Sequence, residues 1–143
     1  MLPSPAAPSI KLQYTDLPNG IKRPVIRIAL SHHGKMVPYF ALVDSGADIN
    51  LFHAELAPLL GLDLEAGERR EVGGVVDGER RPYYVHTVTL HVAGWKHENV
   101  RVGFMPSLSK TGHGLLGQYG FFDLYAVAFN LPKGEIELNE PRT

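Results

Sequence analysis

The chain has 143 residues, which suits one domain with a hydrophobic core of its own. Its formal net charge is −1, which gives no electrostatic basis for binding nucleic acid or an anionic membrane surface. It contains no cysteine, so disulfide bonds and thiolate metal sites are excluded.

The first nine residues contain three prolines and predict a flexible N-terminal arm, followed by one folded domain over residues 10–143. The arm lacks the basic region and the long apolar stretch of a signal peptide. No segment approaches the roughly 20 apolar residues that span a membrane. We therefore expect a cytoplasmic protein with no membrane partner.

Short apolar runs between turn signals predict a series of β-strands in the first third of the chain. Residues 10–14 alternate apolar and polar side chains, and a turn follows at residues 18–20. Residues 25–30 and 37–43 predict a hairpin that turns at residues 31–35. This hairpin leads directly into Asp44.

The pattern then changes to a helical period over residues 50–62, with Gly61 as the stop and Pro58 as a break. The remaining expected elements are a long hairpin with a glycine-rich tip (68–76 and 81–88, continuing to 92), a turn (93–96), a strand (100–105), a loop (107–114), a short helix (121–125) and a closing hairpin (126–130 and 135–138). Many short strands without βαβ alternation predict a small, mainly β, barrel-like domain.

One acidic residue stands out by its position. Asp44 follows the apolar run 39–43 and is followed by a small hydroxyl residue and a glycine, Ser45 and Gly46. An acid at the end of a buried strand lies at the edge of the core, which is a poor position for a merely solvated carboxylate. The turn is therefore a candidate catalytic site.

Three segments, in this order, resemble the retropepsin-like (retroviral-type) aspartic proteases in their single-domain bacterial form. They are Leu42-Val43-Asp44-Ser45-Gly46-Ala47, the glycine-rich Val72-Gly73-Gly74-Val75-Val76-Asp77-Gly78, and Leu115-Leu116-Gly117. The resemblance covers about residues 25–138. It implies a closed β-barrel acid-protease domain with one or two short helices, and an aspartic endopeptidase that needs no cofactor and no metal.

The resemblance also implies roles for individual residues. The catalytic group is Asp44, supported by Ser45 and Gly46. The glycine-rich hairpin is a flap that closes over the substrate. The expected substrate-binding residues are Ala47, Asp48, Gly73, Gly74, Val75 and Val76.

Without a metal or a covalent nucleophile, peptide hydrolysis needs an activated water, and two carboxylates that share one proton can supply it. The chain offers one such candidate, so a symmetric homodimer would pair Asp44 with its copy across a two-fold axis. The expected partners are therefore a peptide or protein substrate and a second copy of this chain, with no nucleic acid.

Two alternatives remain open at this point. Gln118 stands where retroviral enzymes commonly carry an arginine that steadies the dimer, and a neutral side chain cannot make the same charged contact near Asp48. The domain could therefore be a catalytically weak or inactive module of the same fold that serves dimerisation or peptide binding. It could also be an unrelated β-barrel binding domain, which predicts an exposed Asp44.

A metal site is disfavoured by the spacing of the seven histidines. No pair has the helical i, i+4 spacing with a nearby acid that zinc enzymes use. His86 and His91 are five residues apart on a predicted strand and are expected to face opposite sides.

Overall fold

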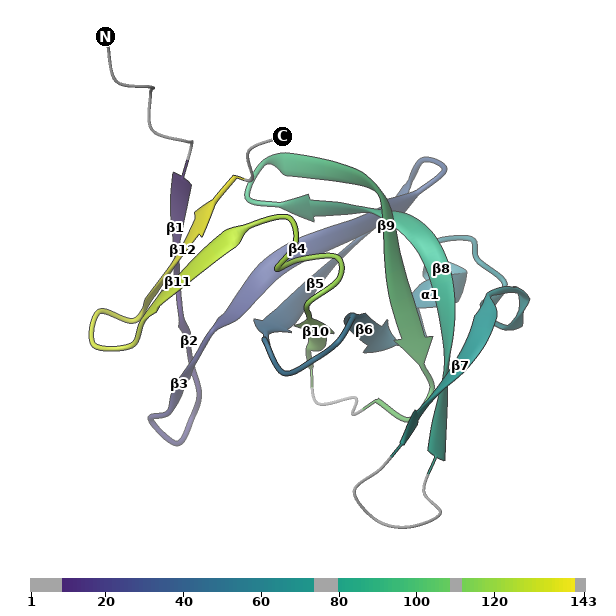
Figure 1. The fold of residues 1–143 in the computed structure, drawn as a ribbon, viewed down its shortest axis with the longest axis horizontal. Coiled ribbons are helices and arrows are strands. Elements are labelled where there is room, and N and C mark those ends of the chain that lie inside the picture. Colours follow the sequence, from purple (N-terminus) through teal and green to yellow (C-terminus); the bar gives the residue numbers. More distant parts are fainter. Residues whose placement is uncertain (1–8, 74–79, 109–111, 141–143) are drawn as a thin grey trace, which may run out of the picture.

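Strands account for most of the computed structural model, which describes residues 9–73, 80–108 and 112–140 (Figure 1). The strands are β1 (Ser9–Gln13), β2 (Thr15–Asp16), β3 (Lys22–Arg23), β4 (Val25–His32), β5 (Lys35–Val43), β6 (Asn50–His53), β7 (Glu68–Gly73), β8 (Arg80–Val92), β9 (Trp95–Met105), β10 (Gly114–Leu116), β11 (Ala126–Asn130) and β12 (Glu135–Asn139). The described helices are α1 (Leu56–Leu59) and the 3-10 helix η1 (Leu64–Ala66). The predicted mainly β class is confirmed.

Six of these strands close into a barrel. Their order is β4-β5-β10-β6-β9-β8, and β8 pairs again with β4 to complete the ring. The β5–β10 and β6–β9 pairs are parallel, and the other pairs of the ring are antiparallel. β7 extends the sheet from β8 outside the ring. Closure removes free edges from these six strands, as predicted for a closed β-barrel domain.

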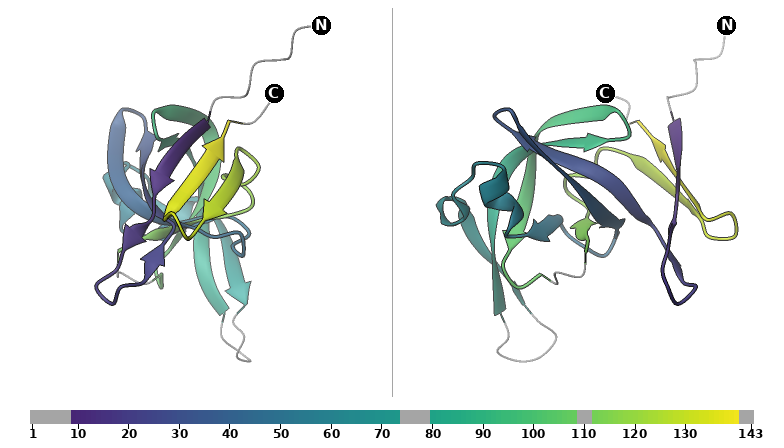
Figure 2. Two further views of the ribbon diagram at one scale, coloured as in Figure 1. Left: turned by 90° about the vertical axis from the view of Figure 1, so that its left-hand side faces the viewer. Right: turned by 180° about the vertical axis from the view of Figure 1, so that it is seen from behind.

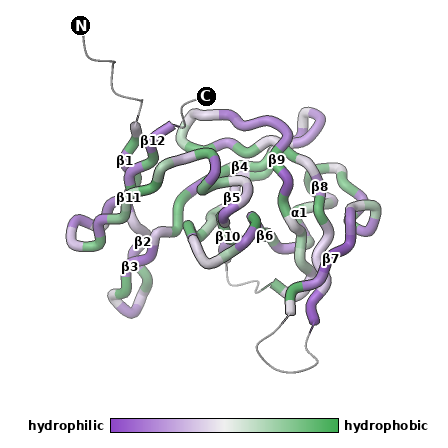
Figure 3. The backbone as a smooth tube through the Cα atoms, in the orientation of Figure 1, coloured by the Kyte–Doolittle hydropathy of each residue, from purple (hydrophilic) through white to green (hydrophobic). Residues whose placement is uncertain are grey.

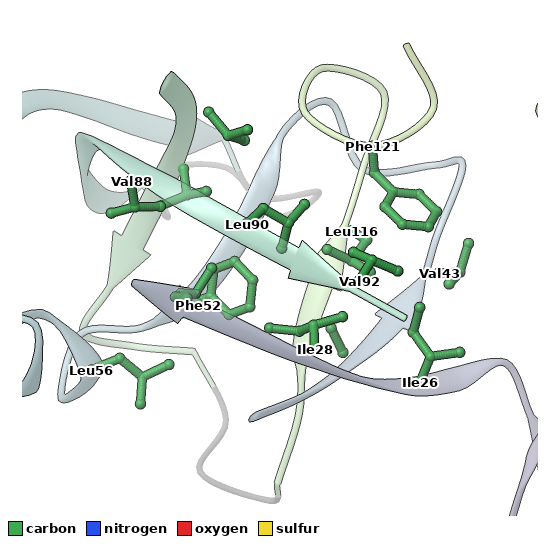
Figure 4. Close-up of a cluster of buried hydrophobic side chains, with 14 of the residues drawn as sticks. Ile26, Ile28, Val43, Phe52, Leu56, Val88, Leu90, Val92, Leu116 and Phe121 are labelled. Atoms are coloured by element: carbon green, nitrogen blue, oxygen red, sulfur yellow. The ribbon is translucent and has the colours of Figure 1, made fainter. Parts of the chain in front are cut away.

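Alternating side chains fill the barrel. On β4, Ile26 and Ile28 are buried and Arg27 between them is exposed, which is the period of two expected of a strand with one buried face. Figure 4 shows Val43, Leu116 and Phe121 together at one end of this core. The core therefore extends to the last residue of β5, directly before Asp44.

A second sheet lies beside the barrel and brings the two terminal strands together (Figure 2). Its order is β1-β12-β11, and the antiparallel register places Ser9 opposite Asn139. Ser9, the last residue of the predicted arm, is thus the first residue of β1, and residues 1–8 of that arm lie outside the described residues. β2 and β3 form a separate short hairpin.

The helix predicted over residues 50–62 is wrong in its first part. Residues 50–53 form β6, which pairs in parallel with β9 and meets β10 at Leu51 opposite Leu115. Only Leu56–Leu59 is helical, with Pro58 inside this single turn, and Gly61 follows it with a φ of 73°. Pairing on both sides of β6 outweighs a local pattern that fits a helix.

Three smaller predictions also differ from the structure. Residues 121–125 form a tight turn instead of a short helix, with the Leu124 amide donating to the Phe121 carbonyl over 2.9 Å. The turn predicted at residues 93–96 is shorter, because β9 already begins at Trp95. Gly114 belongs to β10 and not to the preceding loop. None of the helices in the described ranges is long and apolar enough to cross a membrane.

A histidine and a tyrosine meet where β9 approaches the turn before β11. Nε2 of the half-buried His97 and the hydroxyl of the buried Tyr125 share a hydrogen bond, and their rings pack edge to face. Burial lowers the pKa of His97, and the nearby Glu140 opposes this effect in part. The folded protein therefore favours the neutral imidazole.

We expect this histidine to make folding stability decline as the pH falls below about 6.5. The unfolded chain then binds a proton at His97 while the folded chain does not, so stability is lost between the unfolded pKa and the lower folded pKa. In His97→Gln this part of the decline should vanish. Urea midpoints at pH 7.5 and pH 5.5 measure it, with His33→Asn in an exposed turn as the control. Equal declines in His97→Gln and the parent would contradict the assignment.

Candidate active site

Asp44 lies where two parallel strands of the barrel end. β5 ends at Val43, which is opposite Leu116 of β10, and the Asp44 amide donates to the Leu116 carbonyl over 2.9 Å. Val43 is buried and Asp44 is half-buried. The backbone of Asp44 is therefore anchored in the barrel, while its side chain lies at the surface.

The turn that follows orients the carboxylate. Oδ1 of Asp44 accepts the Gly46 amide hydrogen over 2.9 Å, and the Asp44 carbonyl accepts the Ala47 amide hydrogen over 3.1 Å. A Cβ on residue 46 would lie 3.2 Å from this Oδ1, so glycine gives the tight turn room. Ser45, Gly46 and Asp48 are exposed. Residues 44–48, called the Asp44 loop here, thus present an oriented acid on an open surface.

A second turn, formed by residues 117–120, holds the Asp44 loop from behind. The amide of Gln118 donates to the Ala47 carbonyl over 2.8 Å, and the amide of Tyr119 donates to the Asp48 carbonyl over 2.9 Å. A Cβ on Gly117 would lie only 2.5 Å from the Ala47 carbonyl oxygen. Glycine at position 117 is therefore required for the two turns to approach this closely.

Gln118 uses its side chain within the same chain. Its Nε2 donates a hydrogen bond to the Ser45 carbonyl. Gln118, which stands where retroviral enzymes commonly carry an arginine, thus joins the two turns by a hydrogen bond between uncharged groups.

Asn50 is the site residue that the sequence analysis missed. It is fully buried at the start of β6, where its Oδ1 accepts the Gly117 amide hydrogen over 2.9 Å and its Nδ2 donates to the Gly120 carbonyl over 3.1 Å. The available signal was a polar residue between the apolar Ile49 and Leu51, and the helical interpretation of this segment obscured it.

The predicted substrate-binding residues fall in two places. Ala47 and Asp48 belong to the Asp44 loop, whereas Gly73 is the last residue of β7, opposite Arg80 of β8. This hairpin is hydrophilic along β7 (Figure 3), and the end of β7 and the start of β8 point downward in Figure 1. Its tip, with Gly74, Val75 and Val76, lies outside the described residues.

Among the described residues, the histidines His86 and His91 bind different partners, while the rings of His32 and His33 stack with their centroids 4.0 Å apart. His86 contacts the Leu64 carbonyl at 2.9 Å through Nε2, and Nε2 of His91 lies 2.7 Å from the Ser31 hydroxyl. Within the described ranges, no group of three or more His, Asp and Glu side chains could hold a metal ion.

A cleft of about 390 Å³ lies next to the second turn and does not include Asp44. Ile49, Val85, Tyr119 and Leu124 contribute to its walls. Because Asp44 does not line this cleft, the cleft does not show where Asp44 would meet a substrate.

Comparison with protein families identifies the chain. A family model described as aspartyl protease matches residues 28–119, which is more than half of the sequence. The chain belongs to the aspartyl protease family. The match contains the Asp44 loop and residues 117–119 of the second turn, called the Gln118 turn below, and it excludes β1, β2, β3, β11 and β12.

A solved structure shows that this aspartyl protease family member has the retropepsin-like fold. A retropepsin-like aspartic protease from Rickettsia conorii superposes with a TM-score of 0.64 at 19% identity, over 94% of each chain. EIAV protease in complex with the inhibitor HBY-793 gives a TM-score of 0.46 at 20% identity, over 67% of this chain and 82% of the viral one. A comparison with curated proteins found no match. The predicted aspartic protease family and the predicted retropepsin-like fold are both confirmed.

Proposed function

We propose that this protein is a homodimeric aspartic endopeptidase in which Asp44 of each subunit supplies one carboxylate. The observation that carries the proposal is the Asp44 loop. A member of the aspartyl protease family presents Asp44 at the start of an exposed turn, with its Oδ1 held by the Gly46 amide. That position at the end of a rigid barrel strand is suited to a preorganised catalytic group.

The chemistry follows from two carboxylates that share a proton. The ionised carboxylate accepts a proton from a water molecule, and the protonated one donates to the carbonyl oxygen of the scissile peptide bond. Two carboxylates a few ångströms apart cannot both ionise easily, so one proton is held between them; aspartic protease dyads are the standard example. Their two pKa values belong to the pair and not to either residue.

The need for a second copy is supported by two features of the domain, the exposure of the Asp44 loop and an edge strand with exposed apolar side chains. Asp44 is half-buried, and its neighbours Ser45 and Gly46 are exposed. A few residues after the Gln118 turn, the chain enters β11, which pairs only with β12 among the described strands. Phe129 on β11 and Leu131 just beyond it are 46% and 59% exposed. An edge strand with exposed apolar side chains is suited to pairing with another subunit.

Substrate binding is assigned to the backbone near the acid. On the resemblance to retropepsins, we place the substrate along Ala47 and Asp48 of the Asp44 loop. On the resemblance to retropepsins, we also assign substrate contacts to Gly73, Gly74, Val75 and Val76.

Incubation with a mixed peptide library at several pH values tests the proposal. We expect cleavage products that disappear when a statine-type mimic is added, because a site that fits the transition state binds its mimic far more tightly than substrate. The pH profile should have an acidic and a basic limb, since one carboxylate must be protonated and the other ionised. Peptide binding without any cleavage would favour the non-catalytic module instead.

A further inference from the structure

Asn50 has a polar side chain in a place where polar groups are costly. Among the described residues, the buried polar side chains are those of Asn50, with 0% exposure, and His53, with 5%. A buried amide without partners would lose the hydrogen bonds that water supplies in the unfolded chain. Asn50 instead forms hydrogen bonds with backbone groups through both its amide oxygen and its amide nitrogen.

Those backbone groups are the two ends of the turn that supports the Asp44 loop. Oδ1 of Asn50 binds the Gly117 amide, and Nδ2 binds the Gly120 carbonyl. Gly120 has a φ of 109°, and a Cβ there would lie 2.6 Å from Nδ2 of Asn50. The turn is thus shaped around this side chain.

The connection from Asn50 to the acid is short and continuous. Between Gly117 and Gly120, the amides of Gln118 and Tyr119 hold the carbonyls of Ala47 and Asp48. Any change in the span of the turn is therefore transmitted to the Asp44 loop by two hydrogen bonds of 2.8 and 2.9 Å.

We propose that Asn50 is a positioning residue, which sets the place of the Asp44 loop so that the two Asp44 carboxylates of the dimer meet at the distance needed to share a proton. This inference rests on the proposed function. A catalytic group must be held within about 0.5 Å of its productive place by the residues that support it. A displacement of about 1 Å can lower the rate about a hundredfold.

The substitution Asn50→Asp tests the two hydrogen bonds one at a time, because aspartate has the same shape as asparagine. An ionised carboxylate still accepts from the Gly117 amide but cannot donate to the Gly120 carbonyl. A protonated carboxyl group can do both, as the asparagine does. Because burial raises the pKa of a carboxyl group, the protonated form should persist into mildly acidic solution. In this variant, the pH therefore decides whether the side chain can donate a hydrogen bond to the Gly120 carbonyl.

The experiment compares kcat and KM of the parent, Asn50→Asp and Asn50→Ala at pH 4.5 and pH 7.5, using a peptide that the parent cleaves. We expect Asn50→Ala to lose about tenfold to a hundredfold in kcat at both pH values, with KM changed by less than about twofold. Asn50→Asp should resemble the parent at pH 4.5 and lose about tenfold or more, relative to the parent, at pH 7.5. Val88→Ala serves as the control, because it removes packing from the buried side of β8 at a residue that lies away from Leu116 and Phe121, which flank the second turn (Figure 4).

Circular dichroism at each pH separates positioning from folding. If Asn50→Asp loses activity at pH 7.5 only in proportion to its loss of folded protein, Asn50 has a structural role alone and the inference is overturned. It is also overturned if both Asn50 variants keep the parent kcat at both pH values, and in that case the proposed function stands. A parent that cleaves no peptide overturns the proposed function and this inference together. Should Asn50→Ala fail to fold, the pH response of Asn50→Asp decides.

Discussion

Asp44→Asn is expected to lower kcat for peptide hydrolysis by at least about a thousandfold. The amide cannot accept a proton from water, so neither subunit of the dimer can begin the reaction. The fold should persist, because the asparagine Oδ1 can still accept the Gly46 amide hydrogen. Peptide cleavage followed by mass spectrometry measures the activity, and a urea titration measures the free energy of unfolding, which should change by less than about 1 kcal/mol.

Two controls make this result specific. Asp63→Asn changes an exposed acid before η1 and should keep the parent activity. Mixing the parent with an excess of Asp44→Asn should lower activity beyond simple dilution, because heterodimers contain a single carboxylate. Full activity of Asp44→Asn would refute the assigned role of this residue, and an unchanged activity in the mixture would refute the shared site.

Gly117→Ala is expected to destabilise the protein by about 3 kcal/mol and to lower activity as well. The added Cβ would lie 2.5 Å from the Ala47 carbonyl oxygen and 2.7 Å from the Ile49 carbonyl oxygen. Both atoms belong to the backbone, so no side-chain rotation relieves the overlap, and the two turns must separate. A urea titration measures the stability, and kcat measures the displacement of Asp44.

Gly73→Ala is the matched control for stability, because a Cβ on Gly73 has no heavy atom within 4 Å. We expect its free energy of unfolding to stay within about 1 kcal/mol of the parent. If Gly117→Ala were as stable as Gly73→Ala, the close approach of the two turns would not be a constraint on the fold.

The barrel strands that carry Asp44 could be predicted because their signals are local. Residues 25–30 and 37–43 are apolar runs separated by a turn, and they correspond to β4 and β5. The same run placed the acid directly after a buried strand, and the structure leaves Asp44 at that position. The closing hairpin, β11 and β12, was predictable for the same reason.

The segment after the Asp44 loop could not be assigned from its pattern. Leu51 and the leucines of residues 56–60 fit a helical face, but residues 50–53 pair with strands 50 or more positions further along the chain. Neither partner is visible in a local window. The role of Asn50 was missed for the same reason, because both of its hydrogen-bond partners lie near residue 120.

Ring closure by the β4–β8 pair was likewise invisible to local reasoning, although the count of short strands indicated a barrel. The second copy that the proposed mechanism needs was inferred from chemistry, since one acid per chain is half of a dyad. The local sequence pattern thus indicated the position of Asp44. The contacts that hold Asp44 in place join residues that are far apart in the sequence.

The sheet of terminal strands has a consequence for how the protein is made. β1 leaves the ribosome before its strand partner, β12, has been synthesised, because residues 14–134 separate the two strands. Until then, Ile10 and Leu12, which pack against the core, have no neighbouring strand to hold them in register. Completion of this sheet therefore waits until residue 139 has emerged, whereas the β4–β5 hairpin can form as soon as residue 43 emerges.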